Sequence, residues 1–375
     1  MPVYDAAVNA AWRYLLPTLL LALAAADSAI AQHYIEREVT IPWVLAAPGL
    51  DALLVYVDLP GKHPLVVITH GSSRAREEHR LVTPWQELPQ ALWFARRGWV
   101  AMVVVRRGYG GSGGVEDGTR AGRCPQTDYE GAALYGAEDL RIAIDYARGL
   151  PQVDATQIIA AGVSTGGLVT TALTAKPPPG LVAAINFAGG RGSKADHDVC
   201  NPADLVDAYK SFGKTSRTPM LWLYAENDKF FWPELARKFD AAFRSKGGQD
   251  QFVLAPAIGS DGHSLFRHVD AWSATVDEFL ETQHLAPLKQ LLPAVKAPQV
   301  PPPPGLSETG MAAFESYLLM GPHRAFATSE HAFGLSVANM TVEDARRKAL
   351  DQCKHSAPNH ESCSIVYVDD APVLP

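Results

Sequence analysis

The feature that most constrains this chain is a regular alternation of short apolar runs with longer amphipathic segments between about residues 34 and 282. The short runs are rich in β-branched residues, whereas the longer segments repeat apolar residues at helical spacing. This alternation is typical of a mainly parallel sheet that is flanked by helices. We therefore predict an α/β fold whose first strands are antiparallel. The predicted strands are 50–59, 65–69, 100–105, 158–161, 183–187, 220–224 and 251–254, and the predicted helices are 84–97, 135–148, 167–175, 233–245 and 271–281.

A proline-rich stretch ends this alternation. It includes four consecutive prolines at 301–304, which favour an extended form and cannot continue a helix or a central strand. We assign residues 32–290 to the α/β domain, 291–306 to a linker and 307–375 to a small α+β domain. In the small domain we expect strands at 325–328, 334–337 and 364–369 and a helix at 342–353.

The first thirty residues have the features of a secretory signal. Arg13 precedes an apolar run at 15–26, and Ala29-Ile30-Ala31 has the small-x-small form of a cleavage site, with Ala24-Ala25-Ala26 as a second choice. The alternative is a membrane anchor, which needs about 20 apolar residues. We predict that 1–31 is a signal peptide and that the mature protein is secreted or periplasmic, with no membrane association after cleavage.

The composition also limits the partners of the mature protein. The net charge of −7 leaves no basic stripe for nucleic acid. We therefore predict no nucleic-acid partner, and the sequence leaves the oligomeric state open.

An exported protein with an even number of cysteines usually forms disulfides. The four cysteines allow three pairings, and we favour Cys353 with Cys363, which are close in the tail, and Cys124 with Cys200, which we place in two loops at one sheet edge. The chain has no Cys-x-x-Cys motif and no His-x-x-x-His pair, so we predict no metal site and no cofactor.

The run Gly162-Val163-Ser164-Thr165-Gly166 lies between a predicted strand and a predicted helix. In this context a serine between two glycines occupies a strained strand-to-helix turn, where its hydroxyl can act as a nucleophile. The alternative is a serine that only caps the following helix. We predict that Ser164 is a catalytic nucleophile.

A serine nucleophile needs a base, and the base needs a carboxylate that fixes its orientation. Asp228 follows the predicted strand 220–224, with Glu226 as the alternative acid. His263 lies in a loop after the last predicted strand, with His268 as the alternative base. We predict Asp228 and His263 as the partners of Ser164.

The negative oxygen of a tetrahedral intermediate needs two hydrogen-bond donors. We expect them from the backbone N–H of Thr165 and from Ser72, in the loop after strand 65–69, with Ser73 as the alternative to Ser72. The loops 109–135 and 189–213 are expected to line the site. The candidate lining residues are Tyr109, Trp232 and Ser73, whereas Arg191 and Lys194 are expected to be solvated loop charges.

Together with His70-Gly71 and the turn Arg107-Gly108-Tyr109-Gly110-Gly111-Ser112, these residues resemble the α/β-hydrolase superfamily, in its dienelactone-hydrolase and prolyl-oligopeptidase-like branch. The resemblance covers about residues 35–285, and it implies that the Arg107 turn is structural. Dienelactone hydrolases have a cysteine nucleophile where this chain has Ser164. Together with the predicted signal peptide, the resemblance implies an exported serine hydrolase that cleaves a carboxylic ester through an acyl-enzyme, with a small-molecule or peptide-like substrate. The alternatives are a peptidase or amidase with the same triad and a non-catalytic binding protein on a hydrolase scaffold.

Overall fold

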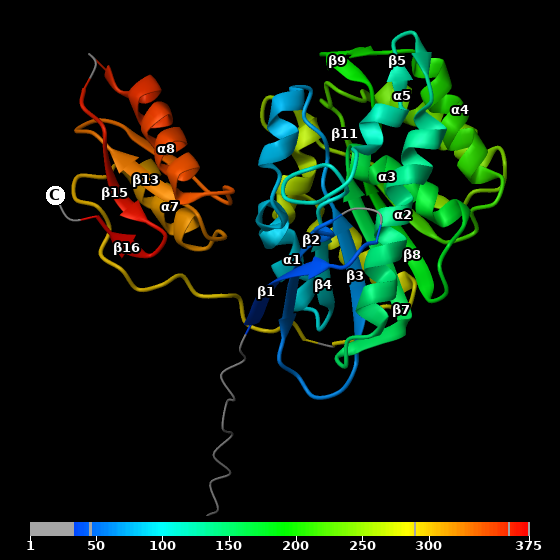
Figure 1. The fold of residues 1–375 in the computed structure, drawn as a ribbon, viewed down its shortest axis with the longest axis horizontal. Coiled ribbons are helices and arrows are strands. Elements are labelled where there is room, and N and C mark those ends of the chain that lie inside the picture. The colour runs from blue at the N-terminus through cyan, green and yellow to red at the C-terminus, as the bar shows by residue number, and fades with distance from the viewer. Residues whose placement is uncertain (1–33, 45–46, 289, 359–360, 374–375) are drawn as a thin grey trace, which may run out of the picture. The chain divides into compact units, whose positions relative to one another are not determined.

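The computed structural model describes residues 34–44, 47–288, 290–358 and 361–373, so the predicted signal peptide lies outside the described residues. Its main element is an eight-stranded sheet in the order β1-β2-β4-β3-β7-β8-β11-β12 (Figure 1). β2 runs antiparallel to β1 and β4, and all other neighbours in this sheet are parallel. The strands are β1 (Tyr34–Ile41), β2 (Leu50–Val57), β3 (His63–Thr69), β4 (Val100–Val104), β7 (Val153–Val163), β8 (Leu181–Phe187), β11 (Met220–Ala225) and β12 (Asp250–Ala255).

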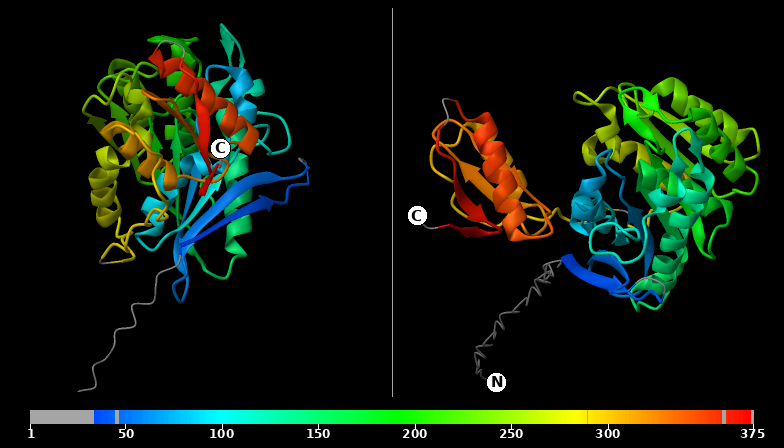
Figure 2. Two further views of the ribbon diagram at one scale, coloured as in Figure 1. Left: turned by 90° about the vertical axis from the view of Figure 1, so that its left-hand side faces the viewer. Right: turned by 45° about the horizontal axis from the view of Figure 1, so that its top comes forward.

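Helices cover both faces of this sheet, as the two views of Figure 2 show. One face packs against α2 (Tyr129–Arg148), α3 (Thr165–Ala175), α4 (Pro202–Gly213) and α5 (Pro233–Arg244). The other face packs against α1 (Leu88–Ala95) and α6 (Val269–Thr282). Short 3₁₀ helices are η1 (Arg76–Leu81), η2 (Pro84–Glu87), η3 (Asp117–Arg120) and η4 (Gly262–Arg267), and short strands are β5 (Gly122–Arg123), β6 (Gln126–Thr127), β9 (Ser193–Ala195) and β10 (Asp198–Val199).

The central strands are apolar on both sides because both faces of the sheet are buried. In β3, Leu65 and Val67 join the core on the α2–α5 side, whereas Val66 and Ile68 join the core on the α1–α6 side. The uninterrupted apolar runs in the sequence therefore reflect burial on two faces. This packing holds the carboxyl ends of the parallel strands at one edge of the sheet, where ligands bind in folds of this class.

A small C-terminal sheet domain follows the described residues between α6 and α7, which form no helix or strand. Its antiparallel sheet has the order β14-β13-β15-β16, and α8 packs against β13 and β14 (Figure 1). A disulfide between Cys353 and Cys363 joins α8 to the residue before β15. The elements are α7 (Glu308–Leu318), β13 (Ala325–Thr328), β14 (Phe333–Ser336), α8 (Val342–Ser356), β15 (Ser364–Val368) and β16 (Ala371–Pro372).

The α/β class and the mainly parallel sheet were correctly predicted, but two loops were not. The loop predicted at 189–213 contains α4, and α2 begins at Tyr129, six positions before the predicted start of 135. Gly131 and Gly136 weaken the helical pattern in this region. Gly136 is required by packing, since a Cβ there would lie 2.7 Å from Val169 and 2.9 Å from Asp117. Among the described residues no helix is both long enough and apolar enough to cross a membrane.

Candidate active site

Ser164 occupies a sharp turn between β7 and α3. Its backbone has φ 56° and ψ −120°, a conformation that L-residues rarely adopt. Glycines on both sides make the turn possible: a Cβ at Gly162 would lie 2.3 Å from the carbonyl oxygen of Gly166, and a Cβ at Gly166 would lie 2.5 Å from that of His70. Backbone strain of this kind is usually retained at functional sites.

His263 lies between Ser164 and Asp228. Its Nε2 is 3.0 Å from the Ser164 hydroxyl oxygen, and its Nδ1 is 3.1 Å from Oδ2 of Asp228. A neutral histidine that donates from Nδ1 to the carboxylate has a free lone pair on Nε2, so this geometry suits removal of the serine proton. The alternative acid Glu226 and the alternative base His268 are both exposed.

Backbone groups and aromatic rings hold the acid and the base. Oδ1 of the fully buried Asp228 accepts the N–H groups of Phe230 and Phe231, both at 2.8 Å. The Phe230 ring stacks on the His263 ring with 4.0 Å between centroids and 8° between planes. The Arg74 guanidinium lies 3.6 Å from the Phe230 centroid, a distance that places it on the ring face opposite His263.

The predicted oxyanion residues come together from two distant parts of the chain. Ser72 follows β3, Thr165 begins α3, and their hydroxyl oxygens are 2.8 Å apart. The first N–H groups of a helix have no partner within the helix, which leaves the N–H of Thr165 available to a ligand. A Cβ at Gly71 would lie 3.1 Å from that of Ser164, so the glycine lets the Ser72 loop approach the nucleophile.

His70 is neutral and holds the same loop. Its Nε2 accepts the backbone N–H of Arg106 at 3.0 Å, so Nδ1 carries the proton and donates to the carbonyl of Gly71 at 2.6 Å. Burial, together with the Arg106 charge, lowers the pKa of His70 well below its ordinary value. His70 is therefore a buried positioning group and not a second base.

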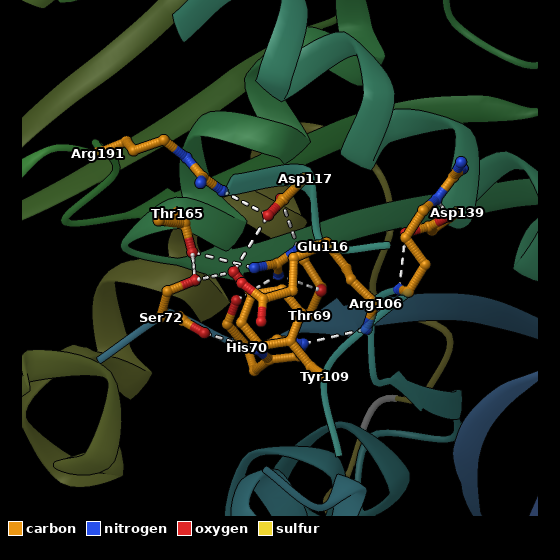
Figure 3. Close-up of polar contacts among 12 residues, drawn as sticks. Thr69, His70, Ser72, Arg106, Tyr109, Glu116, Asp117, Asp139, Thr165 and Arg191 are labelled. Atoms are coloured by element: carbon orange, nitrogen blue, oxygen red, sulfur yellow. Dashed lines mark hydrogen bonds and ion pairs between the residues drawn. The ribbon is translucent and has the colours of Figure 1, made fainter. Parts of the chain in front are cut away.

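A buried charge cluster adjoins Ser72 and Thr165 (Figure 3). Asp117 lies 3.1 Å from Nε of Arg106 and 2.7 Å from Nη2 of Arg191, and all three side chains are at least nine-tenths buried. Burial alone would raise the pKa of Asp117, but the two arginines outweigh it and hold that pKa below its ordinary value. The expectation that Arg191 is a solvated loop charge is wrong. Lys194 is exposed and pairs with Asp198 at 3.1 Å.

The sequence did not single out Arg106 or Asp117. Arg106 is next to Arg107 in the sequence, and the two side chains make different contacts. Arg107 forms a 2.5 Å ion pair with the buried Asp139 of α2 and stacks on Tyr135, in agreement with a structural turn. A signal for Arg106 was its position directly after a buried strand, where charged side chains are unusual unless they are paired.

A disulfide joins the two loops that carry this charge cluster. Cys124 and Cys200 are bonded, and so are Cys353 and Cys363, which are the two predicted pairs. Asp117 precedes Cys124 and Arg191 precedes Cys200, so the ion pair and the disulfide connect the same loops. The backbone N–H of Cys200 also donates to the carbonyl of Gly192 at 2.9 Å.

The three candidate lining residues differ in exposure. Tyr109 is fully buried, so its ring is not an open wall of the site, and its hydroxyl contacts Ser72 at 2.7 Å. Ser73 is exposed, and its carbonyl accepts from His79. Trp232 is partly exposed and packs near His197, with ring centroids 5.5 Å apart. Trp222, on the strand that precedes Asp228, is fully buried in the core.

Among the described residues, Ser164, His263 and Asp228 do not belong to a cluster of candidate metal ligands. In the described part of the chain, Glu330, His331 and Glu361 place ligand atoms within 4.8 Å of one another, but these residues belong to the C-terminal domain. Glu361 accepts hydrogen bonds from the ring and the backbone N–H of His331. Local hydrogen bonding therefore accounts for this cluster.

The model of the dienelactone hydrolase family matches residues 51–277. The acylaminoacyl peptidase of Pyrococcus horikoshii is similar in structure, with 18% identity, a TM-score of 0.49 and coverage of 67% of this chain and 42% of the peptidase. An esterase of Pyrococcus furiosus has 14% identity and a TM-score of 0.44, with coverage of 68% of this chain and 94% of the esterase. No curated protein sequence matched.

Proposed function

Starting from the fact that this chain belongs to the dienelactone hydrolase family, and is therefore a hydrolase, we propose that it cleaves carboxylic esters through a serine acyl-enzyme. The observation that carries the proposal is the unbroken sequence of contacts from Ser164 through His263 to Asp228, at 3.0 and 3.1 Å. Each member has the chemical group that its role requires, and the order of serine, acid and histidine along the chain is that of α/β-hydrolases.

In the proposed mechanism, the hydroxyl oxygen of Ser164 attacks the ester carbonyl carbon while Nε2 of His263 takes the hydroxyl proton. The negative charge that develops on the carbonyl oxygen is stabilised by the backbone N–H groups of Ser72 and Thr165. When the intermediate collapses, the bond to the leaving alcohol breaks and His263 returns the proton to that alcohol. Water then repeats these steps on the acyl-enzyme and releases the acid.

The surroundings of His263 support its role as base. Asp228 stabilises the imidazolium that forms during each step, and its own charge is held by two backbone N–H groups. The stacked Phe230 ring limits rotation of the imidazole. In this proposal His263 can therefore accept and return a proton without a rearrangement of Asp228 or Phe230, which hold it.

We further propose that the protein is exported. Two cysteine pairs at disulfide distance support an oxidising compartment. Sequencing the N-terminus of the mature protein tests this proposal. A start directly after Ala26 or Ala31 is expected, and a mature protein that retains Met1 would contradict export by a cleaved signal.

The test of the catalytic proposal is the Ser164→Ala variant. We expect loss of about 10⁶-fold in the kcat for a p-nitrophenyl ester, and loss of covalent labelling by an organophosphonate. Ser245→Ala, in an exposed serine at the end of α5, is the matched control and is expected to keep both. Unchanged ester turnover in Ser164→Ala would refute the assignment.

A peptidase or amidase activity with the same triad is the alternative. Paired substrates with one acyl group and either a p-nitrophenyl ester or a p-nitroanilide separate the two, because only the leaving group differs. A kcat/KM for the anilide equal to or above that for the ester would reassign the enzyme. A non-catalytic binding protein would turn over neither substrate and would not be labelled.

A further inference from the structure

Five side chains form a closed ring of polar contacts beside the proposed oxyanion site (Figure 3). Arg106 donates from Nη2 to the Thr165 hydroxyl at 3.0 Å, which contacts the Ser72 hydroxyl at 2.8 Å. The Ser72 hydroxyl contacts the Tyr109 hydroxyl at 2.7 Å, and Tyr109 donates to Oδ1 of Asp117 at 3.1 Å. Oδ2 of Asp117 accepts a hydrogen bond from Nε of Arg106 at 3.1 Å, which closes the ring.

The charged members determine the direction of every hydroxyl proton in the ring. Asp117 is ionised and can only accept, so the proton of Tyr109 points to it and the Tyr109 oxygen accepts the proton of Ser72. At the other end Arg106 can only donate, so the Thr165 oxygen accepts from it. The Thr165 proton is then directed to Ser72. Each hydroxyl has one proton, and all three protons are used inside the ring.

This direction leaves the Ser72 hydroxyl unable to donate to a substrate oxygen. The donors that remain on Ser72 and Thr165 are their backbone N–H groups. These two residues are 93 positions apart, and the ring joins the loop after β3 to the start of α3. The relative position of the two N–H groups therefore depends on the ring.

We propose that Tyr109 and Asp117 are positioning residues for the oxyanion site, which they hold through the hydroxyls of Ser72 and Thr165. This inference rests on the proposed serine-hydrolase function. A donor that is preorganised for the developing negative charge contributes to the transition state far more than to the bound substrate. Loosening the ring should therefore lower kcat and leave KM almost unchanged.

Arg191 supports the ring from outside. Its Nη2 lies 2.7 Å from Oδ1 of Asp117, the oxygen to which Tyr109 donates. With two guanidinium groups beside it, Asp117 stays ionised in the interior and keeps its role as final acceptor. A single arginine, already shared with Thr165, would leave the buried carboxylate less well compensated.

The first test is Tyr109→Phe, which removes one hydroxyl and keeps the ring system of the side chain. We expect kcat to fall by about 10- to 100-fold and KM to change by less than about 2-fold, since removal of a complete oxyanion donor costs about 10²–10³-fold. Affinity for a trifluoromethyl ketone, which places an oxyanion in the same site, should fall in parallel with kcat. Tyr317→Phe is the matched control, because Tyr317 is a fully buried tyrosine of the C-terminal domain whose hydroxyl donates to the backbone carbonyl of Asp369.

The second test compares Thr165→Val with Thr165→Ser. Valine removes the hydroxyl at nearly constant shape, whereas serine keeps it, so the ring predicts a loss of kcat in the valine variant and near-wild-type kcat in the serine variant. This pair also replaces Tyr109→Phe if that variant does not fold. The double variant Ser72→Ala with Tyr109→Phe should be no slower than the slower single variant, because both break the same ring.

The outcomes separate this inference from the proposed function. If Ser164→Ala is inactive but Tyr109→Phe keeps wild-type kcat and ketone affinity, the positioning role is refuted and the triad stands. Equal losses in Thr165→Val and Thr165→Ser, or multiplied losses in the double variant, would also refute it. If Ser164→Ala keeps full activity, the proposed function itself fails.

Discussion

Asp228 and Asp117 are both fully buried carboxylates beside Ser164 or its neighbours, but their partners differ. Asp228 accepts from His263 and from the backbone N–H groups of residues two and three positions further on. Asp117 instead faces Arg106 and the Tyr109 hydroxyl from the turn after β4, and Arg191 from the loop after β8. One carboxylate is held by its own turn, and the other neutralises buried charge.

Asp228 therefore has a proposed role in the reaction, whereas Asp117 has a role in stability. In the proposed mechanism, loss of the charge on Asp228 affects an imidazolium that exists only during turnover, and the backbone donors of Asp228 can bond to an amide oxygen as well. Loss of the charge on Asp117 leaves two guanidinium groups in the interior without a counter-ion, a strongly unfavourable state. The two positions should therefore respond in opposite ways to the same substitution.

The largest expected effect is that of Asp228→Asn on activity. We expect kcat to fall by about 10³–10⁴-fold, because the amide cannot hold His263 in its productive tautomer, while the free energy of unfolding changes by less than about 1 kcal/mol. Ester turnover and chemical denaturation measure the two quantities. Asp261→Asn is the matched control, since its side chain accepts only the N–H groups of Lys229 and His263 and an amide oxygen can replace it. A comparable loss of kcat in the control would argue against a special role for Asp228.

Asp117→Asn should reverse this pattern. We expect the free energy of unfolding to fall by about 3–5 kcal/mol at neutral pH, as for a buried ion pair that loses one partner. Since the pKa of Asp117 is lowered in the folded protein, its stabilising contribution is complete above about pH 4 and is lost as the pH falls toward the folded pKa.

The stability difference between wild type and Asp117→Asn should therefore shrink in acid. Denaturation curves recorded from pH 7 to pH 3 measure this, with the exposed Asp145→Asn as control. A pH-independent difference would show that Asp117 contributes through shape and not through charge.

A smaller effect is expected from removing the Cys124–Cys200 disulfide. The double variant Cys124→Ser with Cys200→Ser should lose about 2–4 kcal/mol of stability. It should also lower kcat, because the bond connects the loops that carry Asp117 and Arg191. The matched control is the double variant Cys353→Ser with Cys363→Ser, which cuts the disulfide of the C-terminal domain and should leave kcat unchanged. Equal kcat in both double variants would show that the Cys124–Cys200 disulfide does not influence the proposed active site.

The smallest effect concerns Phe230. Phe230→Leu keeps an apolar side chain but removes the ring that stacks on His263, and aromatic pairs contribute about 0.5–1.5 kcal/mol beyond area burial. We expect the free energy of unfolding to fall by about 0.5–1.5 kcal/mol and kcat to fall by about 2- to 12-fold, since the same contact orients the base. Phe252→Leu, in a ring that stacks on Tyr224, is the control. A kcat unchanged by Phe230→Leu would show that Asp228 alone orients the base.

The sequence was sufficient to predict the fold class, and it named as candidates the three residues that the structure brings together in the proposed triad. Ser164, Asp228 and His263 each follow a recognisable strand, and parallel strands place their carboxyl ends at one edge of the sheet. The glycines around Ser164 marked the turn, because only residues without a Cβ let the chain pass so closely. Local pattern and topology were therefore enough to name these residues as candidates.

Tertiary structure alone decided the partners of the buried charges. Arg191 and Asp117 lie in loops without periodicity, so nothing in their local sequence distinguished a buried ion pair from solvated charges. A charge can be buried only where an opposite charge reaches it, and here that depends on how the connection between β4 and α2 meets the connection between β8 and α4. The sequence alone determined the fold class and the candidate nucleophile, whereas the fold decided which buried groups hold the surroundings of that residue in place.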